Sequence, residues 1–302
     1  MTVLRTAPLD AVSAPVTRRR FLVGAGAAAA GLALYSGEIA RHEVQVVSRP
    51  IDILNLPTAF NGLRLLQLSD IHLDEFTEPS FLERIVRRAN VLAPDIVLLT
   101  GDFITKGSLT FLAARHAAHR CAELLAGLAC PLRFAILGNH DVSVSAPMVV
   151  AALESNGIPV LVNRHVAVDR SGDRLWICGA DEPGTSRPNL DQTVPARPDA
   201  PVILMAHPPD YADRVLQHPR GPMVDLMLSG HSHGGQVRLP FAGPLVLPPL
   251  GRKYVQGLFR FNRMQLYVNR GIGTVGLPFR LNCPPEMTVL TLRPAVPATA
   301  AS

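Results

Sequence analysis

Gly230-His231-Ser232-His233-Gly234-Gly235-Gln236 is the stretch on which the fold and chemistry of this chain depend. It directly follows residues 224–229, an apolar run that predicts a short buried strand. Two imidazoles separated by one residue, in a glycine-rich turn at the end of a strand, can converge on a pair of adjacent metal ions. A His-X-His pair alone is equally typical of two surface loop histidines. The ends of the other predicted strands decide between these interpretations.

The order of predicted elements indicates the fold class. Apolar runs predict strands at 63–68, 95–100 and 132–137, and helices are predicted at 81–92, 108–128 and 147–155. The second half carries mostly strands, at 160–162, 166–168, 175–178, 202–206, 226–228, 265–268 and 287–292. Alternating strands and helices followed by strands predict an α/β protein with two packed sheets and helices outside.

Five of the predicted strands end in residue types that bind metals. These residues are Asp70 and His72, Asp102, Asn139 and His140, His207, and His231 with His233. Each alone could be an ordinary turn or cap residue, but strand ends of this kind face the site crevice, so together they predict a metal site. The set contains no thiolate, and seven candidate ligands among these eight residues are too many for one tetrahedral ion. It favours two divalent ions, of manganese, zinc or iron, bridged by a carboxylate.

The same residues resemble a known family. Asp70-X-His72, Gly101-Asp102, Gly138-Asn139-His140-Asp141, His207 and Gly230-His231-Ser232-His233 resemble, in order, the five motifs of calcineurin-like metallophosphoesterases. The resemblance covers about residues 60 to 295. It implies a four-layer sandwich, with two mixed sheets flanked by helices, and a phosphoesterase with two metal ions.

The resemblance also implies a role for each site residue. Asp70, His72 and His233 would hold one ion, and Asn139, His207 and His231 the other, with Asp102 bridging both. A hydroxide between the ions would attack phosphorus. His140 matches the histidine that contacts the substrate phosphate and can protonate the leaving oxygen. Asp141 either orients His140 or caps the turn that follows.

Departures from the wider family narrow the substrate class. Gly101-Asp102 continues as Phe103-Ile104-Thr105-Lys106, without the Asp-Arg-Gly of the protein Ser/Thr phosphatases, which disfavours a phosphoprotein. Residues 234–240 and 267–274 resemble the YaeI-like bacterial branch of exported or membrane-associated phosphodiesterases, whose relatives cleave UDP-2,3-diacylglucosamine in lipid A synthesis. We expect a phosphodiester or a nucleotide-sugar-lipid pyrophosphate as substrate. A phosphomonoesterase, or a metal-binding protein without turnover, is the alternative. Arg238 and Arg270 either contact phosphate or are solvated.

The amino-terminal residues predict export. Arg18-Arg19-Arg20 precedes an Ala/Gly-rich apolar stretch, and residues 17–22 resemble the twin-arginine signal read by the export machinery of the bacterial inner membrane. The stretch is about 15 residues, shorter than a spanning helix, which favours a signal over an anchor. No clean Ala-X-Ala site precedes Glu38, so an uncleaved signal acting as an anchor in the inner membrane stays open. We expect a periplasmic protein with a signal or anchor and linker at 1–48, a catalytic domain at 49–296 and a tail at 297–302.

Composition limits the remaining classes. With 302 residues, 48% of them hydrophobic, the chain can bury the core of one large domain. The basic residues are mostly scattered arginines, and no basic run interleaves with aromatic residues, so nucleic-acid binding is not expected. Four cysteines, at 121, 130, 178 and 283, form no CXXC pair and are expected to be free, buried thiols.

The segment after the His-X-His turn has two interpretations. Residues 239–250 are apolar and too rich in proline for a helix or a central strand. They either fold over the sheet edge with their side chains buried, or form an exposed apolar lip that meets a membrane surface. In the second case Arg252 and Lys253, which follow the segment, would contact anionic head groups.

Overall fold

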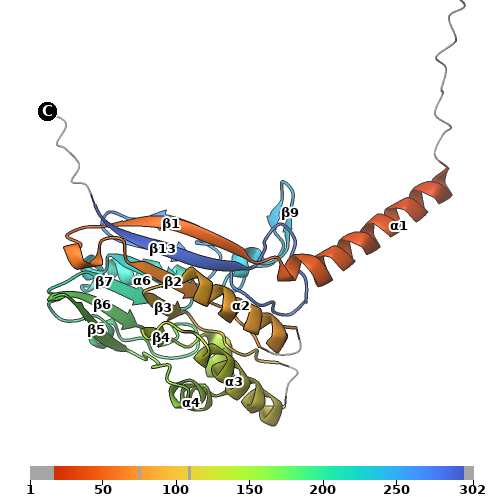
Figure 1. Cartoon of the computed structure of the whole chain (residues 1–302). Coiled ribbons are helices and arrows are strands. Elements are labelled where there is room, and N and C mark those ends of the chain that lie inside the picture. Colours follow the sequence, from red (N-terminus) through yellow and green to blue (C-terminus); the bar gives the residue numbers. More distant parts are fainter. Residues whose placement is uncertain (1–16, 74–75, 108–109, 296–302) are drawn as a thin grey trace, which may run out of the picture.

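Two β-sheets packed face to face form the centre of the protein, with helices on both outer faces (Figure 1). The computed structural model describes residues 17–73, 76–107 and 110–295. The first sheet has the order β1-β13-β2-β3-β4 and the second β11-β12-β8-β7-β6-β5. Both are mixed, because β13 runs antiparallel to β2 in the first, and β11 and β5 run antiparallel to their neighbours in the second. The predicted fold class is confirmed.

The first sheet consists of β1 Gln45–Ile53, β2 Arg64–Leu68, β3 Ile96–Leu99, β4 Arg133–Ala135 and β13 Glu286–Pro294. The second consists of β5 Arg164–Arg170, β6 Asp173–Gly179, β7 Val202–Met205, β8 Leu226–Ser229, β11 Gly257–Arg260 and β12 Gln265–Val268. A separate two-stranded hairpin pairs β9 Arg238–Leu239 with β10 Gly243–Pro244.

Helices α2 Pro79–Leu92, α3 Phe111–Ala126 and α4 Asn139–Ser155 pack against the first sheet. Shorter helices pack against the second: α5 Leu190–Thr193, η4 Pro209–Tyr211, α6 Ala212–Gln217 and η5 Gly221–Met223. The remaining short helices are η3 Thr58–Phe60 and η6 His233–Gly235. Between the sheets lies a third apolar core, which includes Leu65, Leu98, Ile177, Leu228 and Leu290.

Burial on both faces explains why the site-bearing strands were predictable. β3, β7 and β8 are four-residue strands in which every residue is buried. A strand covered on both faces reads as a continuous apolar run, as in parallel sheets with helices outside. β2, β3 and β4 run parallel, as do β6, β7 and β8, so the carboxyl ends within each sheet lie at one edge.

Two boundaries differ from the sequence-based expectation. β1 was not predicted, because it is an edge strand whose first six residues are at least partly exposed, and the expected domain start at residue 49 falls inside it. The strand expected at 160–162 is a single bridge between Val160 and Ala135. It extends no further because β4 ends at Ala135. The expected tail at 297–302, like Ser108 in the expected helix, lies outside the described residues.

A long apolar helix leaves the domain at its amino-terminal end (Figure 1). α1, Arg18–Leu34, has no buried residue and continues through η1 Tyr35–Ile39 and η2 Ala40–His42. The segment Arg18–His42 is long and apolar enough to cross a membrane, a property that signal sequences share. This helical segment is longer than the apolar stretch itself, because it also includes Arg18, Arg19 and Arg20 at one end and Glu38 and Arg41 at the other. The four cysteines are buried and free, as expected.

Candidate metal centre

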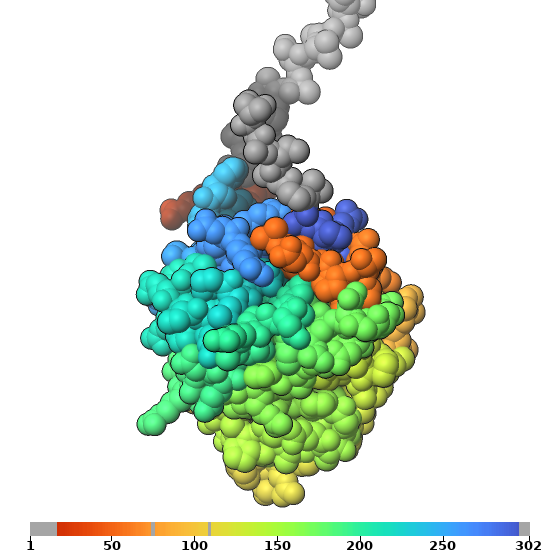
Figure 2. Space-filling model, turned by 90° about the vertical axis from the view of Figure 1, so that its left-hand side faces the viewer, coloured from red at the N-terminus to blue at the C-terminus, as the bar shows by residue number. Residues whose placement is uncertain are grey.

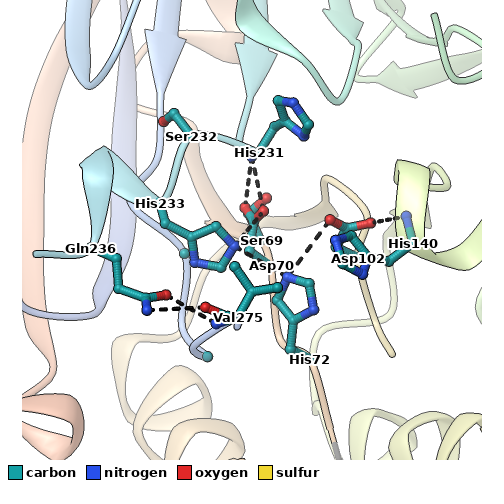
Figure 3. Close-up of polar contacts among 12 residues, drawn as sticks. Ser69, Asp70, His72, Asp102, His140, His231, Ser232, His233, Gln236 and Val275 are labelled. Carbon is teal, nitrogen blue, oxygen red and sulfur yellow. Dashed lines mark hydrogen bonds and ion pairs between the residues drawn. The ribbon is translucent and has the colours of Figure 1, made fainter. Parts of the chain in front are cut away.

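The polar residues at the strand ends converge in two groups. Asp70, His72 and His233 form one group, and Asp102, His207 and His231 form the other. Within each group the potential ligand atoms lie within 4.8 Å of one another, and all six residues are buried. In Figure 3 the rings of His72 and His233 turn toward the carboxylates of Asp102 and Asp70. Loops from both sheets thus meet at one place.

Left-handed backbone conformations aim these side chains inward. Positive φ angles occur at Asp70 (51°), His72 (48°), Asp102 (56°), His231 (69°) and His233 (51°). A non-glycine residue in this region costs of order 1 kcal/mol or more, and such conformations cluster at functional sites. The fold accepts this cost at five of the residues that the sequence pointed to.

Two glycines in the motifs are required by close packing against the acidic residues. A Cβ at Gly230 would lie 2.1 Å from Oδ2 of Asp70, and one at Gly138 would lie 2.1 Å from Oδ1 of Asp102. Any side chain there would displace the carboxylates. The backbone N–H of His231 also donates to Asp70, at 2.9 and 3.0 Å from its two oxygens.

Contacts behind the rings fix which histidine nitrogen faces the site. Nδ1 of His207 lies 2.7 Å from the carbonyl oxygen of Thr100, and Nε2 of His231 lies 2.8 Å from that of Pro249. A carbonyl oxygen only accepts hydrogen bonds, so these ring nitrogens carry the protons. In the neutral form of each ring, the opposite nitrogen keeps its lone pair, as in metal sites held by a second layer of contacts. Nδ1 of His72 lies 2.9 Å from the Thr105 hydroxyl, which can play the same part.

Unpartnered buried atoms show that the donor set fits cations. Oδ1 of Asn139 and Nε2 of His207 are buried without a hydrogen bond, although Nε2 of His207 lies 3.1 Å from Oδ2 of Asp102. Nε2 of His72 lies 3.1 Å from Nε2 of His233. At that distance the two ring nitrogens share either one proton or one cation. Buried polar atoms in native proteins are almost always satisfied, so these atoms, and Oδ1 of Asn139 above all, fit metal ligands.

Asp102 lies between the two groups. Its Oδ2 is 3.1 Å from Nε2 of His207 and 3.6 Å from Nε2 of His72. Burial lowers the pKa of His207, but the Asp102 carboxylate outweighs this and raises that pKa to about 10. Burial holds the pKa values of His72 and His233 well below the ordinary value for histidine. Both rings are therefore neutral and can offer a lone pair to a metal ion. Asp102 therefore contacts one histidine of each group: a neutral ring in His72, and in His207 a ring whose proton a metal ion would have to displace.

His140 lies at the rim of this centre. Its Nδ1 accepts a hydrogen bond from the backbone N–H of Lys106 at 2.8 Å, so the neutral ring carries its proton on Nε2. Its own backbone N–H donates to Oδ1 of Asp102 at 2.9 Å. The ring stacks edge-on against His72, with 4.9 Å between centroids. A half-buried N–H donor therefore stands beside the candidate ligands.

Asp141 caps a turn and does not orient the His140 ring. Its carboxylate accepts from the backbone N–H groups of Asp102, Phe103 and Gly138, at 2.8 to 2.9 Å. Of the two expected roles, capping is confirmed. Because the same carboxylate holds the backbone of Asp102, Asp141 also fixes the residue between the two groups. The element α4 begins at Asn139 but is broken at Ser145, whose backbone is extended, so the helix predicted at 147–155 is its second part.

The arginines differ from expectation. Arg270 is mostly buried and pairs with Glu286, so it is neither solvated nor directed at the cleft. Arg238 donates to the carbonyl oxygen of Gly234 at 2.8 Å. Arg280, which the sequence analysis did not single out, is fully buried and lies 3.5 Å from Nδ1 of His233. It also donates to the carbonyl oxygen of Arg270 at 2.9 Å. In the sequence, Arg280 stands out only as a single charged residue within an apolar segment.

A cleft of about 400 Å³ opens above the two groups. Part of its lining consists of the polar residues Asp102, Asn139, His140, His231 and His233. The rest of its lining includes the apolar residues Val237, Leu245, Val246, Val275 and Leu277. The candidate centre is therefore reached through a cleft that combines polar residues of the site with apolar side chains.

Comparison with known proteins identifies the family. Residues 63–235 match the family model described as calcineurin-like phosphoesterase. The chain belongs to this family. It is a metal-dependent hydrolase of phosphoesters, as the motif order predicted.

Similar proteins support the assignment of this phosphoesterase. It is 32% identical over 290 residues to the uncharacterized metallophosphoesterase YkuE of Bacillus subtilis (strain 168), covering 92% of this chain and 98% of YkuE. It is 33% identical to the phosphodiesterase YaeI of Escherichia coli (strain K12), covering 76% and 82%. It is 27% identical to the UDP-2,3-diacylglucosamine pyrophosphatase LpxG of Chlamydia trachomatis (serovar D), covering 78% and 86%.

The Thr105→Val variant of this phosphoesterase is expected to bind metal about 10- to 100-fold more weakly, the usual effect of losing a contact behind a ligand. The hydroxyl that holds Nδ1 of His72 is lost while the side-chain volume is kept. Thr105→Ser, which keeps the hydroxyl, is the matched control. Competition with a chelator, followed by metal analysis, measures the effect. Equal affinity in both variants would show that the contact does not support the ligand.

Proposed function

We propose that this phosphoesterase hydrolyses a phosphodiester or a pyrophosphate, and that its substrate is lipid-linked, as UDP-2,3-diacylglucosamine is. The observation that carries the proposal is the cleft, whose lining combines residues of the candidate metal centre with apolar side chains. A phosphate group would lie against the polar side and an apolar group against Leu245, Val246 and Leu277. The names of YaeI, a phosphodiesterase, and LpxG, a pyrophosphatase, support the same chemistry.

The proposed cofactors are two divalent ions of manganese, zinc or iron, which suit a mixed set of imidazole, carboxylate and amide donors. Asp70, His72 and His233 would hold one ion, and Asn139, His207 and His231 the other, with Asp102 shared. When bound, two such ions lower the pKa of water toward neutrality and neutralise charge that grows on the phosphoryl oxygens.

The protein's own residues would position the substrate and move one proton. His140 carries a proton on Nε2, at the edge of the cleft, and would donate it to the leaving oxygen. Asp141 holds the backbone on either side of Asp102, so the shared carboxylate needs no rearrangement during the reaction. Fixed donors of this kind supply much of the rate in phosphoryl transfer.

The full chain, loaded in turn with manganese, zinc and iron, is expected to show a higher kcat/KM on bis(p-nitrophenyl) phosphate than on p-nitrophenyl phosphate. A diester presents one charge fewer and a second group that the apolar part of the cleft lining can contact. The opposite ratio would make the protein a phosphomonoesterase. No turnover of either compound with both metals bound would make it a binding protein.

We also propose that the chain is exported by the twin-arginine machinery to the periplasm, with α1 as its signal or as an anchor in the inner membrane. Arg18, Arg19 and Arg20 occupy the first turn of α1, after the cap residue Thr17, and the apolar residues that follow are exposed. Cell fractionation of the Arg18→Lys, Arg19→Lys variant tests the route. Unchanged export of that variant would contradict it.

A further inference from the structure

The mouth of the cleft is bordered by large apolar side chains that face solvent. Of the two expectations for residues 239–250, complete burial is wrong: Phe241 is fully exposed and Val246 is 77% exposed. We define the apolar rim as Leu239, Phe241, Leu245, Val246 and Leu277, all of which are exposed. Leu245, Val246 and Leu277 also line the cleft, so the rim is continuous with the apolar part of the cleft lining.

The residue at the tip of the β9–β10 hairpin, Phe241, does not stabilise the fold. Phe241 has a φ of 64°, a conformation in which glycine or asparagine is favoured and a bulky residue is an outlier. Its ring contributes nothing to a core, since it is fully exposed. An aromatic side chain held at an unfavourable position, away from the core, indicates a role in contact with something outside the domain.

The position of α1 indicates what that partner is. In Figures 1 and 2 the hairpin protrudes from the same end of the domain from which α1 departs. The part of the segment Arg18–His42 that stands clear of the domain, α1, has 17 residues and is about 25 Å long at 1.5 Å per residue, close to the thickness of an apolar layer of about 30 Å. Arg18, Arg19 and Arg20 lie at its far end, so the near end would leave the bilayer beside the rim.

The join between α1 and the domain holds the helix next to the cleft. The backbone N–H of Arg280 donates to the carbonyl oxygen of Ser36 at 3.0 Å. A Cβ at Gly37 would lie 3.0 Å from the ring of Phe279, so the two segments are in close contact. Phe279 and Arg280 lie two and three residues after Leu277 of the rim. A membrane entered by α1 would therefore lie close to the mouth of the cleft.

We infer that the domain docks on a lipid bilayer through the apolar rim, with the cleft opening onto the membrane so that an amphiphilic phosphoester enters without crossing water. The partner is the bilayer itself. The entry of a lipid-linked substrate from the membrane rests on the proposed function. The docking of the domain on the bilayer can be tested by itself. Aromatic and aliphatic side chains of this kind insert at the boundary between head groups and acyl chains. Lys253 was expected to assist, but its ammonium is paired with Asp213 at 2.8 Å.

The first test places a fluorescent probe on the rim. The full chain carrying Phe241→Cys is labelled with a polarity-sensitive dye and reconstituted into phosphatidylethanolamine and phosphatidylglycerol vesicles with or without spin-labelled lipid. The native cysteines are buried, so the new thiol reacts selectively. We expect a blue shift and strong quenching at position 241. The matched control is Val91→Cys, which is exposed in the last turn of α2, at the opposite edge of the sheet from the site. The inference would be overturned if the dye at position 241 showed neither a blue shift nor quenching by spin-labelled lipid. A blue shift without lipid quenching, as expected if the labelled chains contact one another, would also overturn it.

The second test separates docking from catalysis. Phe241→Ser lies outside the cleft lining and is expected to hydrolyse soluble bis(p-nitrophenyl) phosphate at the parental rate. It is expected to hydrolyse p-nitrophenyl hexadecyl phosphate in vesicles about tenfold more slowly, because burying a phenyl ring changes partitioning by that factor or more. Val91→Ser is expected to alter neither rate. Equal rates for Phe241→Ser and the parent on vesicles, or equal losses on both substrates, would overturn the docking role. If no diester is cleaved by any form, the proposed function fails, while the quenching result still decides the docking.

Discussion

The Asp102→Asn variant is expected to lose turnover by at least about 10²- to 10³-fold, the loss typical of removing one electrostatic contact at a reacting centre. It should also hold both metal ions more weakly. Asp102 stands within 3.6 Å of Nε2 of both His72 and His207, so one carboxylate serves both groups. A neutral amide of the same shape has one oxygen to offer and no charge.

Metal content and rate are measured together in the Asp102→Asn variant. The matched control is Asp52→Asn, an exposed carboxylate on β1 that is remote from the site in sequence and sheet order. We expect the control to keep two ions and its full rate. A fully active Asp102→Asn variant with two ions bound would remove Asp102 from the bridging position.

The His140→Ala variant is expected to keep both metal ions but to react about 10²- to 10⁴-fold more slowly, the usual contribution of a general acid. The ring carries its proton on Nε2 and belongs to neither ligand group. The defect should be larger for an alkyl leaving group than for p-nitrophenol, because p-nitrophenolate leaves without being protonated. The rate ratio of the two diester types measures this difference.

His165→Ala is the matched control, because His165 is exposed and contacts the carbonyl oxygen of Gln192, away from the cleft. It should leave both rates unchanged. Loss of metal from His140→Ala would move His140 into the ligand set. Equal defects with both leaving groups would exclude it as the proton donor.

The fold and the ligand positions were predictable because both depend on short-range features of the chain. β3, β7 and β8 are buried on both faces and therefore read as apolar runs, and the residue after such a strand lies at the active edge. The edge strand β1 escaped prediction because its first residues are partly exposed and give no such signal.

Contacts between distant segments could not be predicted. Arg280 meets His233 across 47 positions and Asp141 meets Phe103 across 38, and neither pairing leaves a local pattern in the sequence. The exposure of Phe241 was also undetermined, because an apolar, proline-rich segment suits a buried loop as well as a projecting hairpin. The left-handed backbone conformation of the site residues could not be predicted from the sequence either, because histidine and aspartate occur with either sign of φ.

Anomalous diffraction from crystals of the manganese- or zinc-loaded full chain tests the central claim most directly. The account predicts two peaks about 3.5 to 4 Å apart, on either side of the Asp102 carboxylate. One peak should be surrounded by Asp70, His72 and His233, and the other by Asn139, His207 and His231. A single peak, or two peaks that do not share Asp102, would contradict it.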